Sequence, residues 1–372
     1  MDKKIALIPL LYNENNYGGI LQFFALQKKL IDLGYTVEIL KVNDDSLIIR
    51  PKVTFKRLVM SVLKPYFNFK KKKNKKTIQL LLADRFAKNM MFKTKYYCDV
   101  VNIKNVNLSN YFAFICGSDQ IWNPRHARKR AFLSFAPKGS LTIIYAASMG
   151  VEELDNRQKK VYKKYINKIE YVSVREQSAK NILDSFLCRN DIEVVADPTL
   201  LLTAREWNQL IPASSVQEPY VFVYILGKVT EDKLSVVLKY SRQKKLKIVR
   251  IPYASAESLD DFTFGDILIN NASPNEFLSL IKNAECVITD SFHACVFSIL
   301  FSKDFYVLKR DNSNSMFGRI ETLFNHFHIG SERIIASSIT ECNSIDYSSK
   351  ERYQDELIHI SMDFLIKSLK RE

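Results

Sequence analysis

Residues 5–42 read IALIPLLYNENNYGGILQFFALQKKLIDLGYTVEILKV. The first seven of these residues form an apolar run that predicts a buried strand, and apolar residues recur at helical spacing over 20–31. Gly34 follows where that helix is expected to end, and a second apolar run covers 35–42. This order of strand, helix and strand predicts two parallel strands joined by a right-handed crossover.

The same alternation continues through the rest of the chain. Further strands are predicted over 111–116, 141–147, 171–174, 192–195, 220–226, 246–251, 286–289 and 305–309. Each of the first four ends at a polar or glycine-containing turn, as in open α/β sheets, whose ligands gather at the carboxyl ends of the strands. The pattern therefore predicts an α/β protein with two Rossmann-like domains facing across a cleft, the usual place for a ligand.

A stretch rich in Pro, Ala, Ser and Gln, residues 211–219, separates the two series of strands. We expect an N-terminal α/β domain over 1–211, which carries a basic insertion at about 50–76, and a C-terminal α/β domain over 219–345. Residues 346–372 contain apolar residues at helical spacing and are expected to form a helix that packs back on the N-terminal domain.

Composition excludes several classes of protein. The chain has 372 residues, 47% of them hydrophobic, which is enough for large cores and excludes disorder. No apolar run reaches the roughly 18 residues of a membrane-spanning helix, and residues 1–13 do not resemble a signal peptide. The six cysteines form no CxxC pair and are expected to be buried and reduced. We therefore expect a cytoplasmic protein.

The formal charge of +15 is concentrated in one segment, residues 50–76, which carries eleven Lys and Arg residues and no acid. Aromatic and aliphatic residues alternate with these cations, as at the headgroup zone of an anionic membrane. The alternatives are a solvated loop and a nucleic-acid contact. Since no nucleic-acid-binding motif occurs elsewhere, we expect no nucleic-acid partner and favour peripheral contact with the inner face of the membrane.

His293 is the histidine best placed for chemistry, in the segment ITDSFHA at 288–294. A predicted strand ends at Thr289 and a helix begins by His293, so Ser291 and His293 would lie at a helix N-terminus that favours anions. The alternative is an ordinary capping turn built by Asp290 and Ser291. His326 and His328 are too close in sequence to share a helical face and have no Cys or carboxylate set nearby, so no metal site is predicted.

Two other polar clusters follow predicted strands, GSDQIWNP at 117–124 and SVRE at 173–176. Asp119 could act as a base towards a sugar hydroxyl, Trp122 could stack on a sugar ring, and the Arg175 guanidinium could bind phosphate or carboxylate. The alternatives are an Asx turn, a core tryptophan and a helix-capping ion pair. Gly18 and Gly19 indicate a close approach of backbone rather than a dinucleotide site, because the full GxGxxG spacing is absent.

Together these segments resemble the polysaccharide pyruvyl transferase family. The resemblance rests on six segments in order, NYGGILQ at 16–22, GSDQIWNP at 117–124, YAASMG at 145–150, SVRE at 173–176, DPTLL at 197–201 and TDSFH at 289–293. It implies a fold like that of the GT-B glycosyltransferases, with phosphoenolpyruvate as the donor. It also implies a sugar, or a lipid-linked oligosaccharide of a capsule or exopolysaccharide, as the acceptor, and a pyruvate ketal as the product.

The resemblance also implies roles for individual residues. Arg175, Arg319, Ser291 and His293 would bind the donor in the C-terminal half of the cleft, and His293, Asp119 and Arg175 would be catalytic. The acceptor would contact Gly18, Gly19, Ser118, Asp119, Trp122 and Asn123. No cofactor is expected beyond phosphoenolpyruvate as co-substrate. In place of the family's frequent His-Gly-Thr, the chain has His293-Ala294-Cys295, and the added methyl group could narrow the phosphate pocket.

Two other functions fit the same residues. A GT-B glycosyltransferase that uses a nucleotide sugar would need a base pocket and a diphosphate site in the second domain. An inactive sugar-binding member of an export complex would not need His293, Arg175 and Arg319 together.

Overall fold

The fold is described from a computed structural model, which describes residues 3–9, 16–42, 46–48, 100–252, 264–310, 318–335, 339 and 343–371. The basic segment at 50–76 lies outside the described residues.

The first half of the chain builds a sheet of seven parallel strands in the order β3-β2-β1-β4-β5-β6-β7. Its strands are β1 (Lys4–Ile8), β2 (Thr36–Lys41), β3 (Val100–Asn102), β4 (Ala113–Gly117), β5 (Leu141–Ala147), β6 (Tyr171–Val174) and β7 (Glu193–Val194). The helices that accompany it are α1 (Tyr17–Asp32), α4 (Asn156–Ile166) and α5 (Gln177–Asp184). The central strands β4 and β5 are buried throughout, which explains their unbroken apolar sequences.

The second half builds a separate parallel sheet of six strands in the order β10-β9-β8-β11-β12-β13. Its strands are β8 (Tyr220–Tyr224), β9 (Lys247–Arg250), β10 (Ile267–Leu268), β11 (Cys286–Thr289), β12 (Asp304–Leu308) and β13 (Ile334–Ile335). Its helices are α7 (Glu231–Lys244), α8 (Pro274–Lys282), α9 (Phe292–Leu300) and α10 (Gly318–His326). The predicted α/β class with two parallel sheets is therefore confirmed.

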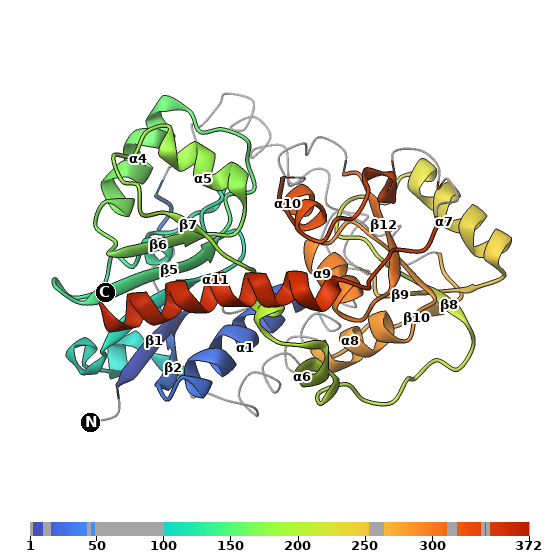
Figure 1. Cartoon of the computed structure of the whole chain (residues 1–372), viewed down its shortest axis with the longest axis horizontal. Coiled ribbons are helices and arrows are strands. Elements are labelled where there is room, and N and C mark those ends of the chain that lie inside the picture. The colour runs from blue at the N-terminus through green and yellow to red at the C-terminus, as the bar shows by residue number, and fades with distance from the viewer. Residues whose placement is uncertain are drawn as a thin grey trace, which may run out of the picture.

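The two halves meet along helices rather than along sheet edges (Figure 1). The Tyr17 ring at the start of α1 stacks on Phe277 of α8 with 4.9 Å between centroids, and its hydroxyl donates to the Ala272 carbonyl at 2.7 Å. Trp207 of the short helix α6 (Ala204–Asn208) packs edge-on against Phe297 of α9 at 5.1 Å. One hydrophobic core thus runs from the first half into the second.

Helix α11 (Lys350–Lys370) crosses from the second half back to the first, along the face shown in Figure 1. The Gln354 side-chain amide donates to the carbonyls of Leu200 and Leu202, each at 3.0 Å, and the Ser361 hydroxyl accepts from the Ala196 N–H at 2.9 Å. These bonds fix α11 to the segment that follows β7. No helix within the described ranges has the length and hydropathy that a membrane span requires.

Local signals explain most of the helix boundaries. α1 is followed by Gly34 at φ +87°, and Thr203 caps α6 by accepting from the Glu206 N–H at 3.2 Å. The expectation that the cysteines are buried is wrong for Cys188, which is exposed, whereas Cys116, Cys286 and Cys295 are buried.

Candidate active site

Each of the two sheets has a switch point, where the strand order reverses. In the first sheet the strand order reverses between β1 and β4, and in the second it reverses between β8 and β11. Loops diverge at such points, which makes a crevice outside the carboxyl ends of the strands. Asp119 follows β4 and His293 follows β11, so both residues lie beside these crevices.

Asp119 is held in an uncommon backbone conformation directly after β4. Its φ is +62°, and its backbone carbonyl accepts from the N–H groups of Ile121 at 2.8 Å and Ser148 at 2.9 Å. The side chain is nearly buried, and one carboxylate oxygen accepts from the Asn16 amide at 3.3 Å. Burial alone would raise the pKa of Asp119, but the charges of Arg175, His293 and Arg319 outweigh it and hold the pKa below its ordinary value.

Arg175, at the end of β6, is surrounded by carboxylates. Nη1 donates to Asp197 at 2.5 Å, Nη2 lies 3.5 Å from Asp119, and Nε lies 3.8 Å from Glu176. The guanidinium carbon also lies 4.4 Å from the centroid of the Phe292 ring. Burial by itself would lower the pKa of Arg175, whereas the three carboxylates raise it, so the side chain stays charged.

Asp197 joins the two halves of the site. Its Oδ1 accepts from the N–H and hydroxyl of Thr199, at 3.0 and 2.6 Å. Its Oδ2 binds Arg175 and lies 3.6 Å from His293 Nε2, which belongs to the second half. Burial alone would raise the pKa of Asp197, but His293 and Arg175 hold it far below its ordinary range, so this carboxylate is ionised.

His293 occupies the first turn of α9, where Ser291 is the N-cap and accepts from the Ala294 N–H at 3.5 Å. Its ring rests against Gly18 at the start of α1, so closely that a Cβ at position 18 would overlap the imidazole. His293 Nε2 is buried and makes no hydrogen bond to a described residue, although the ionised Asp197 carboxylate lies 3.6 Å away. The imidazole therefore stands beside a carboxylate at the N-terminus of a helix.

Arg319, in the first turn of α10, approaches the same cluster from the second half. Nη1 lies 3.9 Å from Asp119, and Nη1 and Nη2 lie 2.8 and 3.1 Å from the Gln120 side-chain amide, whose oxygen would accept from both if the amide were turned by 180°. Nε is buried and has no acceptor within the described part of the chain. Burial, and then the neighbouring charge of Arg175, lowers the pKa of Arg319 to about 10, so it is still protonated near neutral pH.

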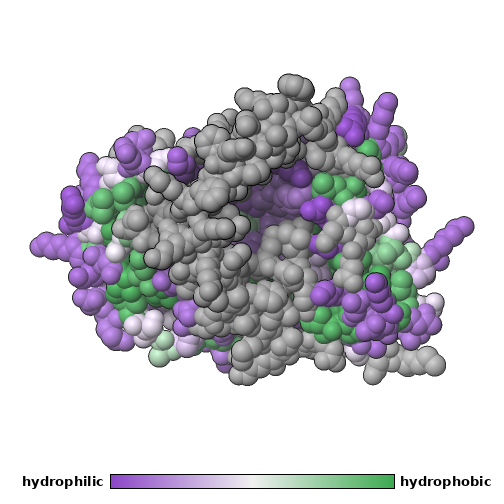
Figure 2. Space-filling view, turned by 180° about the vertical axis from the view of Figure 1, so that it is seen from behind, coloured by the Kyte–Doolittle hydropathy of each residue, from purple (hydrophilic) through white to green (hydrophobic). Residues whose placement is uncertain are grey.

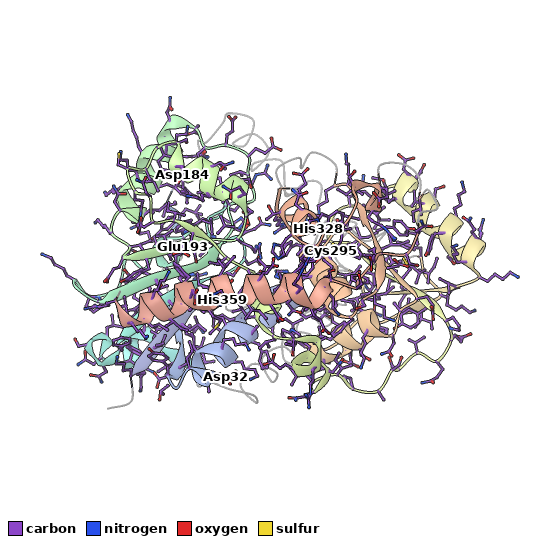
Figure 3. All side chains as sticks on the ribbon, viewed as in Figure 1. Asp32, Asp184, Glu193, Cys295, His328 and His359 are labelled. Carbon is purple, nitrogen blue, oxygen red and sulfur yellow. The ribbon has the colours of Figure 1, made fainter. Side chains whose placement is uncertain are left out.

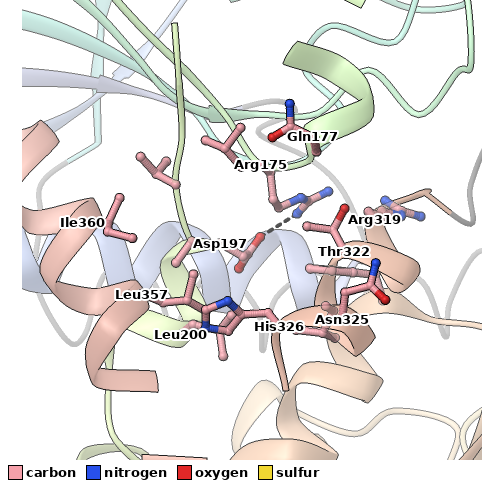
Figure 4. Close-up of a pocket in the computed structure, with 15 residues that line it drawn as sticks. Arg175, Gln177, Asp197, Leu200, Arg319, Thr322, Asn325, His326, Leu357 and Ile360 are labelled. Carbon is pink, nitrogen blue, oxygen red and sulfur yellow. Dashed lines mark hydrogen bonds and ion pairs between the residues drawn. The ribbon is translucent and has the colours of Figure 1, made fainter. Parts of the chain in front are cut away.

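A pocket of about 460 Å³ opens beside these charges (Figure 4). Arg175, Asp197 and Arg319 line it together with residues of α10 and α11. On the face opposite α11, Figure 2 shows hydrophilic residues between the two halves. The charged cluster lies beside the pocket, which Arg175, Asp197 and Arg319 help to line.

The structure brings most of the predicted site residues together, but not all of them. Trp122 is fully buried, stacks on Phe132 at 5.4 Å and donates from Nε1 to the Ala131 carbonyl at 3.0 Å. The prediction that it stacks on a sugar ring is therefore wrong, because a large apolar ring beside a strand end gains more by entering the core. The structural alternative, a core tryptophan, is the correct one.

Other residues that were predicted to contact the acceptor make contacts that stabilise the fold. The Ser118 hydroxyl is buried and donates to the Ala146 carbonyl at 2.8 Å, and the Asn123 side-chain oxygen accepts from the Arg125 N–H at 3.1 Å. Gly18 makes room for His293, while Gly19 lies next to Asn16. Ala294 and Cys295 are wholly buried in the core, so the methyl group at position 294 does not narrow the pocket.

Three contributors were not predicted as site residues, namely Asp197, Glu176 and Gln120. Asp197 stands in DPTLL, directly after a predicted strand, which is the same signal that pointed to Asp119 and Arg175. Glu176 Oε1 accepts from the Ser148 hydroxyl at 2.8 Å and the Met149 N–H at 3.0 Å, so it fixes the loop after β5. Within the described ranges, no group of three or more His, Cys, Asp or Glu side chains could hold a metal ion.

The two parallel sheets, each with its own switch point, define a two-domain α/β protein of the GT-B type. The family model for polysaccharide pyruvyl transferase matches residues 16–312, well over half of the chain. The chain therefore belongs to the polysaccharide pyruvyl transferase family. Comparison with curated protein sequences finds no match.

Solved structures share the architecture at low sequence identity. UGT89C1 of Arabidopsis thaliana, complexed with UDP-L-rhamnose, superposes with a TM-score of 0.51 at 8% identity and covers 100% of this chain and 98% of its own. A putative UDP-N-acetylglucosamine 2-epimerase from Listeria monocytogenes has a TM-score of 0.48 at 10% identity and covers 99% of this chain and 90% of its own. These likenesses concern the fold alone.

Proposed function

We propose that this protein transfers the pyruvyl group of phosphoenolpyruvate to a pair of sugar hydroxyls in a bacterial surface polysaccharide or its precursor. The observation that carries the proposal is that Arg175, Arg319 and His293 surround the buried carboxylates of Asp119 and Asp197. Phosphoenolpyruvate bears a phosphate and a carboxylate, and two guanidinium groups beside a helix N-terminus suit such a dianion. Family membership supports a transferase acting in polysaccharide synthesis.

The reaction needs a proton at C3 of the donor and a nucleophile at C2. A general acid protonates C3, positive charge develops at C2, and the first sugar hydroxyl forms a C–O bond there as it loses its proton. The second hydroxyl then attacks C2 while the bond between C2 and the phosphate oxygen breaks. The products are the ketal and inorganic phosphate. One hydroxyl proton replaces the one given to C3, and the other leaves with phosphate.

The charges of the site suit these steps. Arg175 and Arg319 would bind the two anionic groups, and His293 would bind the phosphate or deliver the proton to C3. Asp119 is ionised and lies beside Arg175, so it could accept a proton from the attacking hydroxyl on the acceptor side. Its partner Asn16 belongs to the NYGGILQ segment, which supports placing the acceptor near the start of α1.

The acceptor would be carried on a lipid at the cytoplasmic face of the membrane. Support for this comes from composition: residues 50–76 hold eleven cations and no acid. Near an anionic surface each cation contributes about 1 kcal/mol. Replacing the lysines at 70–73 by glutamine should reduce binding to phosphatidylserine vesicles at low salt, and unchanged binding would remove this part of the proposal.

A thermal-shift titration with phosphoenolpyruvate tests the donor directly. A ligand at 100 times its dissociation constant stabilises the folded state by about 2.7 kcal/mol. We expect a clear rise in melting temperature for the wild type and a smaller one for His293→Ala. A rise with UDP-sugars and none with phosphoenolpyruvate would instead identify a nucleotide-sugar glycosyltransferase.

Turnover separates binding from catalysis once an acceptor is in hand. His293→Ala should fold normally and lose about 10²–10⁴-fold in turnover, the usual contribution of a positioned general acid. Retained turnover would refute the role of His293.

A further inference from the structure

We propose that Asp290 is a specificity-determining residue that keeps nucleoside diphosphates out of the second domain. Its carboxylate occupies the place at the switch point of the second sheet where a phosphate group would otherwise bind. This role goes beyond the proposed function, because it concerns a class of ligand that the protein excludes and does not depend on which donor the protein uses.

The switch point of the second sheet lies between β8 and β11. These two strands are parallel neighbours, but the sheet continues to β9 on one side and to β12 on the other. Ligands of open α/β sheets bind in the crevice outside the strand ends at such a point. Leu226 and Gly227 follow β8, Asp290 follows β11 and Arg310 follows β12. The phosphates of a nucleotide bound by this domain would therefore lie against these four residues.

The Asp290 carboxylate binds the loop after β8, whereas the N-cap of helix α9 is the next residue, Ser291. Asp290 Oδ1 accepts from the Leu226 N–H at 2.6 Å, and Oδ2 accepts from the Gly227 N–H at 2.8 Å. Gly227 leaves room for this contact, because a Cβ at position 227 would lie 2.8 Å from Oδ2. Consecutive N–H groups that converge on one point form an anion-binding site, and a carboxylate of the chain itself fills this one.

Arg310 supplies the positive charge of the same site. Its Nε donates to Asp290 Oδ2 at 2.8 Å, and its Nη2 donates to Oδ1 at 3.2 Å and to the Asp290 backbone carbonyl at 2.9 Å. The Asp290 side chain is only 1% exposed and that of Arg310 is 16% exposed. Backbone N–H groups and a guanidinium are common partners of a bound phosphate. The carboxylate therefore has the partners that a phosphate would have.

Two properties of this arrangement exclude a phosphate from solution. The carboxylate is tethered to the end of β11, so it competes with a dissolved anion at a high effective concentration. A diphosphate that approached without displacing the carboxylate would meet a like charge at close range. The second domain therefore lacks the diphosphate site that a nucleotide-sugar glycosyltransferase would need.

Three variants test this role of Asp290. Asp290→Ser removes the carboxylate and keeps the two N–H groups and Arg310. Arg310→Met breaks the same ion pair but keeps the carboxylate on the N–H groups, so it controls for the loss of the pair. Asp184→Ser in α5 of the first domain (Figure 3) controls for the change in net charge, because that side chain is 41% exposed and pairs with Lys180 at 3.0 Å.

Isothermal titration with inorganic phosphate and with UDP, at constant ionic strength, is the readout, and circular dichroism checks folding. We expect Asp290→Ser to gain one phosphate site and to bind UDP at least about tenfold more tightly than the wild type, because a charged N–H donor set is then open to the ligand. Arg310→Met and Asp184→Ser should behave like the wild type. If Asp290→Ser unfolds in chloride, millimolar phosphate should restore its spectrum and should not do so for Arg310→Met.

The role of Asp290 would be overturned if Asp290→Ser gains no phosphate site, or stays unfolded in phosphate. An equal gain by Arg310→Met or Asp184→Ser would overturn it as well. These results would leave the proposed pyruvyl transfer untouched, since the titration with phosphoenolpyruvate tests that function separately. Tight binding of UDP by the wild type would also overturn the role of Asp290, and would at the same time favour the nucleotide-sugar glycosyltransferase.

Discussion

The imidazole of His293 packs directly on the backbone of Gly18, and a single additional carbon at position 18 would overlap the ring. Gly18 belongs to the first domain and His293 to the second, so the imidazole of His293 packs on a residue that lies across the domain interface. Glycine is needed here for space rather than for an unusual backbone conformation, because the residue lies within helix α1.

Gly18→Ala should therefore destabilise the protein, although alanine is the better helix former. Overpacking of this kind costs about 1–3 kcal/mol. In a His293→Ala background the ring is gone, but the Cβ of residue 293 still lies 2.8 Å from the added methyl group, so the same substitution should cost less without costing nothing. Urea unfolding of the two single variants and the double variant measures the coupling. Strictly additive effects would mean that the two residues do not press on each other in solution.

Asp197→Asn should be among the most damaging substitutions of a single polar group. Removal of one partner of a buried ion pair costs about 3–5 kcal/mol, and Asp197 pairs with Arg175 at 2.5 Å. Because the folded protein lowers the pKa of Asp197, its contribution to stability is present above the ordinary aspartate value of 3.8 and is lost as the pH falls below it. The difference in unfolding free energy between wild type and variant should therefore shrink below pH 4.

Asp191→Asn is the matched control for that experiment. Asp191 also pairs with an arginine, Arg189, at 2.6 Å, but its side chain is 56% exposed. Exposed pairs contribute about 0–1 kcal/mol, so this variant should stay close to the wild type. Similar losses for the two variants would contradict the central position of Asp197.

Arg319→Met should stabilise the protein and weaken donor binding. Folding lowers the pKa of Arg319 to about 10, which means that burial of the protonated side chain costs free energy at neutral pH. Since one pKa unit corresponds to about 1.4 kcal/mol, the gain should be roughly 1–3 kcal/mol. The difference in stability between Arg319→Met and the wild type should become smaller above pH 10, where the wild-type side chain loses its proton.

Melting temperatures at pH 7 and at pH 10.5 provide the comparison, with Arg352→Met as the control. Arg352 is 67% exposed, and surface substitutions of this kind change stability by about 0.5 kcal/mol or less. A lower melting temperature for Arg319→Met at pH 7 would show that its ion pairs outweigh the cost of burial.

Substitutions of Trp122 test whether this residue of the GSDQIWNP segment serves the fold or contacts the acceptor. Trp122→Ala should cost about 3–5 kcal/mol of stability, because the indole is fully buried against Phe132. Trp122→Phe should retain fold and turnover at the temperature where both variants are folded. A selective rise in the KM for the acceptor in Trp122→Phe, with unchanged stability, would restore the sugar-stacking role.

The sheets could be predicted from the sequence because their strands are buried on both faces and form unbroken apolar runs. Leu141–Ala147 and Cys286–Thr289 were predicted to the residue. The two-residue strands β10 and β13 were not predicted. The short strand β3 and helix α10 were likewise missed.

The site was only partly predictable for a different reason. Polar residues after strands indicate which side chains reach the crevice, and this brought Asp119, Arg175 and His293 together correctly. The pattern gives no information about which residue of a turn points inward, so the sequence left Trp122 open between a sugar contact and a place in the core. The pattern also does not show which side chains contact each other, so Asp197 was not recognised as the carboxylate shared by Arg175 and His293.

Because α11 packs back on the first domain, one hydrogen bond of that domain can form only after α11 has been synthesised. The Ala196 N–H donates to the hydroxyl of Ser361, and Ser361 is synthesised 165 residues after Ala196. At about 5–20 residues per second this delay is roughly ten to thirty seconds. During that time the segment after β7 lacks the partner that α11 supplies. The first domain therefore completes its packing only after both sheets have been made.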